Sequence, residues 1–291
     1  MRINPVLRNE SKLAARTPKF TILLFIYIAI LSAGVLVFYN LYSETFYANG
    51  LDLQSSVMLY FGMAIGQAVL LMFIVPALTS TAICSEREKQ TLDMLLSSKL
   101  TPFQIIIGKL SSSSIKVIML IICTMPIYVI CGLTGGIRIS NIIQLIMFFA
   151  VTTIFVGSIG VFISTYTKTS KVATALTYAI VLFIFIGTLI IAFIILMVAG
   201  MKGNGSDPGI PWIVYLSPAT GFMSMLSNQV GMVGQMGYMV PNMDISKYTE
   251  YISIAIQLGL SVVFIYLSVI KLNPLNTKRK HSKAMKIKKH I

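Results

Sequence analysis

Six long apolar stretches, each free of charged residues except at its edges, dominate this sequence. Each is about as long as the roughly 20 residues that an α-helix needs to cross the hydrocarbon core of a bilayer. In lipid, a helix satisfies its own backbone polar groups, whereas irregular chain does not. We therefore expect an all-α integral membrane protein. Its transmembrane domain would cover residues 20–272, with spans at about 20–40, 57–79, 110–133, 142–166, 172–200 and 251–271.

The Lys and Arg residues are distributed very unevenly among the connecting segments. Residues 1–19, 80–116, 167–171 and 271–291 together hold 20 of the 23 basic residues. Short basic segments remain on the cytoplasmic side of a membrane. This distribution predicts that both termini are cytoplasmic and that the segments 41–56, 132–141 and 201–250 face outward.

The formal charge of +14 on 291 residues is explained by this orientation and does not predict nucleic-acid binding. Residues 4–17 mix apolar and charged residues and are followed by Pro18, which favours a helix within 1–19 that lies on the cytoplasmic interface, or alternatively a simple basic flank. No cleavage site of a secretory signal follows them. The tail 273–291 is polybasic, and we expect it to contact anionic membrane lipids.

The cytoplasmic stretch 84–109, here called the elbow, differs from an ordinary basic loop. Its Ser-Glu-Arg-Glu start places acids in a first helical turn, where they complement the helix dipole. The leucines at positions 92, 95 and 96 follow at helical spacing and form one apolar stripe. A short amphipathic helix is therefore predicted over 85–98.

Thr101-Pro102 predicts the start of a second helix, with Thr as the N-cap and Pro at the first helical position. This helix would run into the third span, where Pro126 can introduce a kink. Lys116 lies within reach of the cytoplasmic edge, so we interpret it as an interfacial anchor; a functional charge inside the span is the alternative.

Two outer features depart from a simple bundle. The fifth apolar run is longer than a bilayer requires, so its helix either tilts or breaks near the outer face. The segment 201–250 is too apolar for a free external loop, and we expect it to re-enter the outer leaflet or to cap the bundle as short helices. Ser217-Pro218 predicts the start of one of them.

Several kinds of chemistry are missing from the sequence. Both His residues lie in the tail, so no His-based metal or nucleophilic centre is expected within the membrane. None of the six predicted spans contains Asp or Glu, which disfavours an ion-coupled carrier. The chain has no G-x-x-x-x-G-K-[ST] loop for ATP phosphates. We therefore expect no enzymatic activity and no cofactor on this chain, with ATP and Mg bound by a partner subunit.

The run from Ile83 to Leu96, followed by Gly108-Lys109, resembles the coupling segment of ATP-binding-cassette (ABC) transporter type-2 permeases. The family pattern is approximately I-x-x-E-R-E-x-G-T-L-[ED]-x-L-L, with G-K at the start of the third span. Gln90 stands where Gly is usual. The interfacial helix, the six spans, the cytoplasmic termini and Leu216-Ser217-Pro218 extend the resemblance over nearly the whole chain.

This resemblance implies a bacterial exporter permease in the cell (plasma) membrane. It would pair with a second copy or a homologous permease and with separate ABC ATPase subunits. The residues implied to couple the permease to the ATPase are Glu86, Arg87, Glu88, Thr91, Leu92, Leu95 and Leu96. The residues implied to line a substrate path at the dimer interface are Gln67, Thr174, Thr177 and Tyr178. An ion-gradient-driven carrier and a membrane scaffold or sensor that recruits a cytosolic partner remain the alternatives.

Overall fold

The structure is a computed structural model of the chain, and it describes residues 18–49, 53–97, 101–135, 137–201, 215, 217–230 and 248–272. All regular elements within these ranges are helices. They are α2 (Pro18–Asn49), α3 (Leu53–Thr79), α4 (Cys84–Glu88), α5 (Leu92–Ser97), α6 (Pro102–Cys123), α7 (Met125–Gly135), α8 (Ile139–Tyr166), α9 (Ser170–Leu182), the π-helix η1 (Phe183–Gly187), α10 (Thr188–Met201), α12 (Pro218–Val230) and α13 (Thr249–Leu272).

Six helical stretches are long and apolar enough to cross a membrane. They contain α2, α3, α6 with α7, α8, α9 with η1 and α10, and α13. The expected all-α, six-span membrane protein is confirmed. The proposed interfacial helix at 1–19 falls almost entirely outside the described residues, as do the tail 273–291 and much of the outward segment 201–250.

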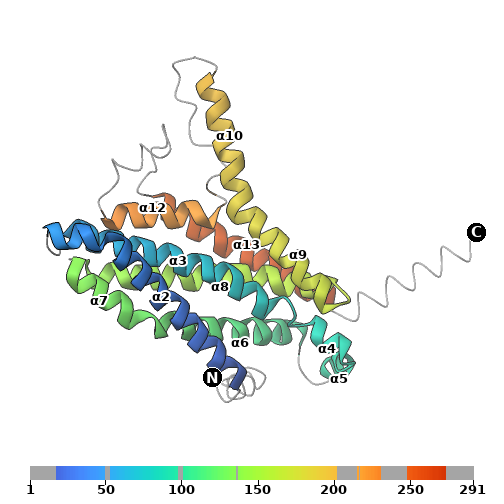
Figure 1. The fold of residues 1–291 in the computed structure, drawn as a ribbon. Helices are drawn as coiled ribbons and strands as arrows, with labels where there is room; N and C mark the ends of the chain where they lie inside the picture. Colours follow the sequence, from blue (N-terminus) through green and yellow to red (C-terminus); the bar gives the residue numbers. More distant parts are fainter. Residues whose placement is uncertain are drawn as a thin grey trace, which may run out of the picture.

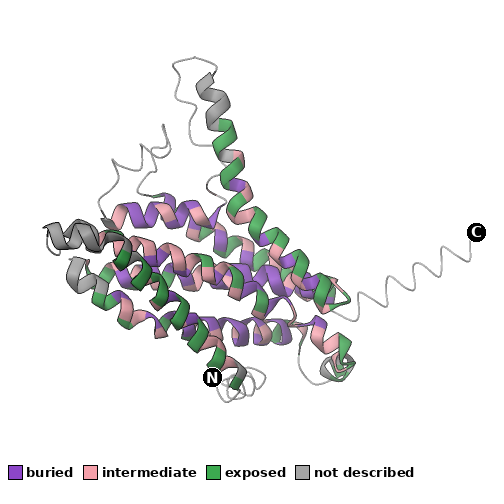
Figure 2. Ribbon diagram, in the orientation of Figure 1, coloured by how far each residue is buried: buried purple, intermediate pink, exposed green. Residues whose placement is uncertain are grey.

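Helix α8 occupies the centre of the bundle. It packs against α13, α6, α3 and α9, and Figure 2 shows it as the most continuously buried of the long helices. By contrast, α2 and the α9–η1–α10 stretch keep most of their surface exposed. This difference suits a membrane protein, because lipid takes the place of protein around the outer helices.

Small residues allow α3 and α8 to approach closely at the end of the bundle next to the elbow. A Cβ added to Gly160 would lie 2.2 Å from Thr79 Oγ1 and 3.2 Å from the backbone carbon of the same residue. A Cβ on the nearby Gly157 would lie 3.0 Å from a methyl group of Leu110 on α6. Helices in lipid associate through such close backbone contacts, so these glycines fix the junction of three spans.

The third span is interrupted where the sequence predicts a kink. Helix α6 ends at Cys123, Thr124 forms a turn, and α7 begins at Met125 with Pro126 in its first turn. The break is held by a neighbour, because Gln67 Nε2 on α3 donates to Thr124 Oγ1 at 3.1 Å. A polar side chain of the second span thus gives Thr124, at the break in the third span, a hydrogen-bond partner.

The outer half of the fifth span departs from the bundle. After α9, five residues form the π-helix η1, and α10 then leans away from the other helices (Figure 1). Helix α12 begins at Pro218, as predicted, and packs on α13, α8 and η1. The outward segment therefore contributes a helix that covers part of the bundle.

The sixth span begins two residues earlier than the sequence indicated. Because α13 starts at Thr249, Glu250 lies in its first turn and is 95% buried, and its Oε1 accepts a bond from Gln144 Nε2 at 3.1 Å. The expectation that no span holds a carboxyl group is wrong at this position. The sequence placed Glu250 in a loop because it precedes the charge-free run.

Candidate functional site

The elbow contains two short helices where the sequence predicted one over 85–98. Helix α4 ends at Glu88, and α5 begins at Leu92. The N–H of Gln90 donates to the carbonyl of Arg87 at 3.1 Å, and the N–H of Thr91 donates to that of Glu86 at 2.9 Å. These two bonds form a Schellman motif, which ends a helix and turns the chain.

Gln90 adopts the left-handed conformation that such a motif requires, with φ of 57°. Glycine is favoured there because a Cβ is strained at positive φ. The pattern that the elbow resembles has Gly at this position. Gln90, which replaces that Gly, therefore lies at the one residue of the turn that needs a positive φ. The break in the predicted helix follows from this turn.

Two charged side chains of α4 bond to the turn that joins the fourth and fifth spans. The guanidinium of Arg87 donates to the carbonyl of Thr165 (3.1 Å), in the last turn of α8, and to that of Thr167, the C-cap of the same helix. The carboxylate of Glu88 accepts the N–H of Ser170 at 2.7 Å and its hydroxyl at 2.6 Å, at the first residue of α9. Each charge complements the helix end that it meets.

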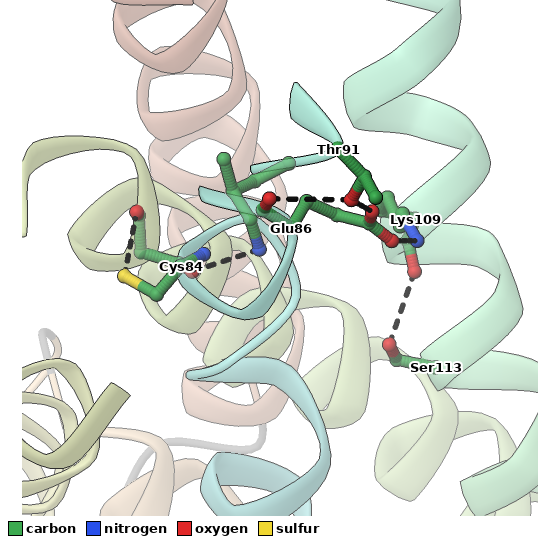
Figure 3. A network of polar contacts seen from close by, with 7 residues as sticks. Cys84, Glu86, Thr91, Lys109 and Ser113 are labelled. Atoms are coloured by element: carbon green, nitrogen blue, oxygen red, sulfur yellow. Dashed lines mark hydrogen bonds and ion pairs between the residues drawn. The ribbon is translucent and has the colours of Figure 1, made fainter. Parts of the chain in front are cut away.

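Glu86 connects α4 to α6, the helix that begins the third span (Figure 3). Its Oε1 pairs with Lys109 Nζ of α6 at 2.9 Å, and its other oxygen accepts the hydroxyl of Thr91. The hydroxyl of Ser113, one turn after Lys109, bonds to the Lys109 carbonyl at 3.0 Å and lies 3.5 Å from the carbonyl of Leu78 on α3. Polar contacts therefore continue from the elbow into the bundle.

The beginning of α4 is buried against α8. Ser164 Oγ accepts the N–H groups of both Ile83 and Cys84 at 2.9 Å, and both of those residues are fully buried. The Cys84 thiol lies 3.0 Å from the Ser164 carbonyl. An N-terminal helix end has unpaired N–H groups, and here a hydroxyl from the fourth span satisfies two of them.

The two Glu side chains of α4 accept hydrogen bonds that favour their charged forms. Helix α3 ends at Thr79, and a turn over residues 80–83 separates it from α4. Burial raises the pKa of Glu86, but hydrogen bonds from Thr91 and Lys109 and nearby lysine charges outweigh it, so the pKa is lowered. The hydroxyl and N–H of Ser170 likewise lower the pKa of Glu88. Both contacts therefore persist at neutral pH.

The surface of the elbow that faces away from the bundle carries side chains that the sequence did not single out. Met94 is 76% exposed and Phe103 is 53% exposed, and Lys89 is exposed at the turn. Leu92 instead packs against the core cluster of Ile83 and Ile105. The backbone of α5 includes Leu95 and Leu96, whose side chains lie outside the described part of the structure. In the sequence, Met94 lies between the leucines of the predicted apolar stripe but is not part of it, and this position could have marked it as exposed.

The four residues implied to line a substrate path occupy different environments. Gln67 and Thr177 are fully buried within the subunit, Gln67 against Thr124 and Thr177 with its hydroxyl on its own helix. Thr174 Oγ1 lies 3.0 Å from the hydroxyl of Ser80, and Tyr178 donates to the carbonyl of Phe73 at 2.7 Å. The last two contacts bring the second and fifth spans together along one seam.

The family described as ABC-2 family transporter protein matches residues 5–273, nearly the whole chain. The chain belongs to this family. A comparison with curated proteins finds no match. As an ABC-2 family protein, the chain is a multi-pass membrane permease of an ABC transporter, and the predicted family is confirmed.

Proposed function

We propose that this ABC-2 permease is half of the membrane domain of an exporter that separate ATPase subunits drive through the elbow. The observation that carries the proposal is the set of bonds from α4 to three spans. Arg87 bonds to the end of α8, Glu88 bonds to the start of α9, and Glu86 pairs with Lys109 on α6.

These bonds favour transmission of force over simple recruitment of a partner. Charge-assisted hydrogen bonds are short and directional, and each one here joins α4 to a helix end or to the first turns of a span. A displacement of α4 would therefore displace the turn between α8 and α9. The fifth span would respond over its whole length, because α9 continues through η1 into α10.

The ATPase would bind the face of the elbow that the bundle leaves free. Met94 and Phe103 supply exposed apolar contacts, and Lys89 supplies a charge. Exposed apolar residues on a protruding element are typical of an interaction site. ATP and Mg would be bound by the partner, since this sequence has no phosphate-binding loop.

A second permease copy, or a homologous one, would complete the substrate path. The α9–η1–α10 stretch presents a largely exposed apolar face, including Leu176, Ile180 and Phe183, that a neighbouring subunit can cover. Thr174 and Tyr178 lie on the adjacent seam with α3 and remain the candidate polar contacts. The apolar character of this face favours an amphipathic or hydrophobic substrate.

The orientation follows the distribution of basic residues. With 20 of 23 basic residues in four alternate segments, both termini and the elbow would face the cytoplasm of a bacterial cell. The elbow then lies on the side where ATP is available. The same orientation would put α12 on the outer side of the plasma membrane.

The decisive experiment is purification of the chain from its native cells, identification of any P-loop ATPase that accompanies it, and reconstitution of the complex in proteoliposomes. We expect ATP-dependent movement of an amphipathic dye, which a hydrolysis-deficient ATPase abolishes. Transport by the permease alone under an ion gradient would replace this proposal with a carrier. ATPase binding without any nucleotide-dependent flux would replace it with a scaffold.

A further inference from the structure

An apolar pocket of about 250 Å³ lies between α3, α8, the η1–α10 part of the fifth span and α12. It is located where α10 separates from the bundle (Figure 1). All four walls belong to one subunit. The pocket adjoins the seam between α3 and α9 through Phe73, which lines it, whereas Thr174, Tyr178 and Ser80 are not among its lining residues.

Tight packing holds α12 on the inner wall of the pocket. The ring of Phe222 stacks on Phe149 of α8, with centroids 5.5 Å apart and planes inclined by 30°. One residue earlier, a Cβ on Gly221 would lie 2.4 Å from Ser253 Oγ of α13. Close contact on this side fixes α12 to the bundle, so the adjacent space is bounded by fixed walls.

The π-helix shapes the outer wall. Leu182, Ile186 and Leu189 line the pocket from the fifth span, and each is between 36% and 48% exposed. A π-helix adds a residue to a helical turn and is frequent at functional sites. Ile186 lies within η1, Leu182 is the last residue of α9 and Leu189 lies in the first turn of α10, so the π-helix sets the spacing of this wall, and its rim is partly open.

The lining offers no polar group that still needs a partner. Among the described residues that line it, Thr152 and Thr153 are the only ones with polar side chains. Thr152 Oγ1 donates to Gln257 Oε1 at 3.1 Å, and Thr153 Oγ1 donates to the Phe149 carbonyl at 2.7 Å. None of the lining residues that the structure describes is charged. A ligand with a headgroup, a charge or several hydroxyls would therefore find no recognition here, whereas a hydrocarbon chain would.

We propose that this pocket binds part of one acyl chain of a bilayer phospholipid. An apolar cavity of about 150 Å³ stays dry and holds a benzene ring, so 250 Å³ has room for about ten carbon atoms. That is roughly half of one chain and too little for two. The lining residues of α3, α8 and the fifth span come from within the stretches that cross the membrane. At that depth, acyl chains are the surrounding solvent.

The test uses the full chain in nanodiscs of phosphatidylcholine that contain a fraction of phosphatidylcholine with a diazirine in the middle of one acyl chain. After illumination, labelled peptides are located by mass spectrometry. We expect labels on the lining residues of α3 and α12. Ala68→Trp on α3 and Ala219→Trp on α12, which fill the pocket from two different helices, should each reduce that labelling by at least about fivefold. Ala255→Trp, on an exposed position of α13, should leave it unchanged.

The result would be read only in variants that match the wild type in elution volume and thermal midpoint. If either Trp variant fails this criterion, Ile186→Trp at the 48% exposed rim takes its place. Equal labelling of the lining residues in wild type and folded Trp variants would overturn the proposal. So would labels confined to outward faces such as Val262 and Tyr266 of α13. The readout needs no ATPase, so it stands apart from the proposed coupling.

Discussion

Glu88 accepts both the backbone N–H and the hydroxyl of Ser170, at 2.7 and 2.6 Å, although 82 residues separate them in the sequence. This relationship bonds the elbow to the first turn of the fifth span. The fifth span is among the least buried in the subunit, so few other contacts restrain it. The Glu88 contact is therefore a direct connection between the elbow and one of the two least buried spans of the subunit.

Replacing Glu88 with Gln should reduce ATP-driven transport by roughly tenfold, because a neutral amide loses the charge-assisted pair of bonds. Ser170→Ala should act in the same direction. The combined variant should lose little more than the stronger single one, since both changes remove one interaction. Transport in proteoliposomes and copurification of the ATPase are measured for all three. Additive losses, or loss of ATPase binding, would contradict a role in transmission.

Gln90→Gly should stabilise the protein by about 1 kcal/mol. The substitution relieves the strain of a Cβ at φ of 57°, and part of that gain is offset by the greater backbone entropy of Gly in the unfolded chain. Lys89→Gly is the matched control, because Lys89 has an ordinary φ of −81° and should lose stability. Thermal midpoints in detergent measure both. A lower midpoint for Gln90→Gly would rule out this account of the turn.

The elbow illustrates what the sequence predicts and what it leaves out. Thr101-Pro102 specifies a helix start by local chemistry, and the structure contains the full capping box between Thr101 and Gln104. The break at Gln90 was not predicted, because Gln does not by itself favour the left-handed conformation and only the surrounding contacts impose it. The leucine spacing alone therefore predicted a single helix across residues that form a turn in the structure.

The partners of the charged residues were also beyond the sequence. Acids in a first turn predict a helix start, but they do not show that Glu86 reaches Lys109, 23 residues away on another helix. Charges near a protruding segment suggested contact with a motor protein, whereas the structure turns Glu86, Arg87 and Glu88 toward the spans. Long-range pairing of this kind depends on how helices pack, which local periodicity does not encode.

Gly160→Ala should destabilise the protein by about 1–3 kcal/mol, because its Cβ would meet Thr79 at 2.2 Å and the neighbouring backbone at 3.2 Å, where little relaxation is available. Gly259→Ala is the control. It lies on a helix with nothing within 4 Å of the added Cβ, and it should be neutral or slightly stabilising. Thermal unfolding of both purified variants decides. Equal changes in the thermal midpoint of the two variants would show that the close approach of α3 and α8 at Gly160 does not contribute to stability.

Gln67→Leu distinguishes a structural role for Gln67 from the substrate contact implied by the family resemblance. In this structure the side chain is fully buried and bonded to Thr124, whose hydroxyl also donates to the Ile121 carbonyl at 2.7 Å. Thr124 would thus keep a partner, and we expect a loss of only about 1 kcal/mol. The relative rates for a panel of amphipathic dyes should stay constant, since no substrate reaches a side chain enclosed within one subunit. Changed relative rates with an unchanged thermal midpoint would instead place Gln67 on the path in another conformation of the transporter.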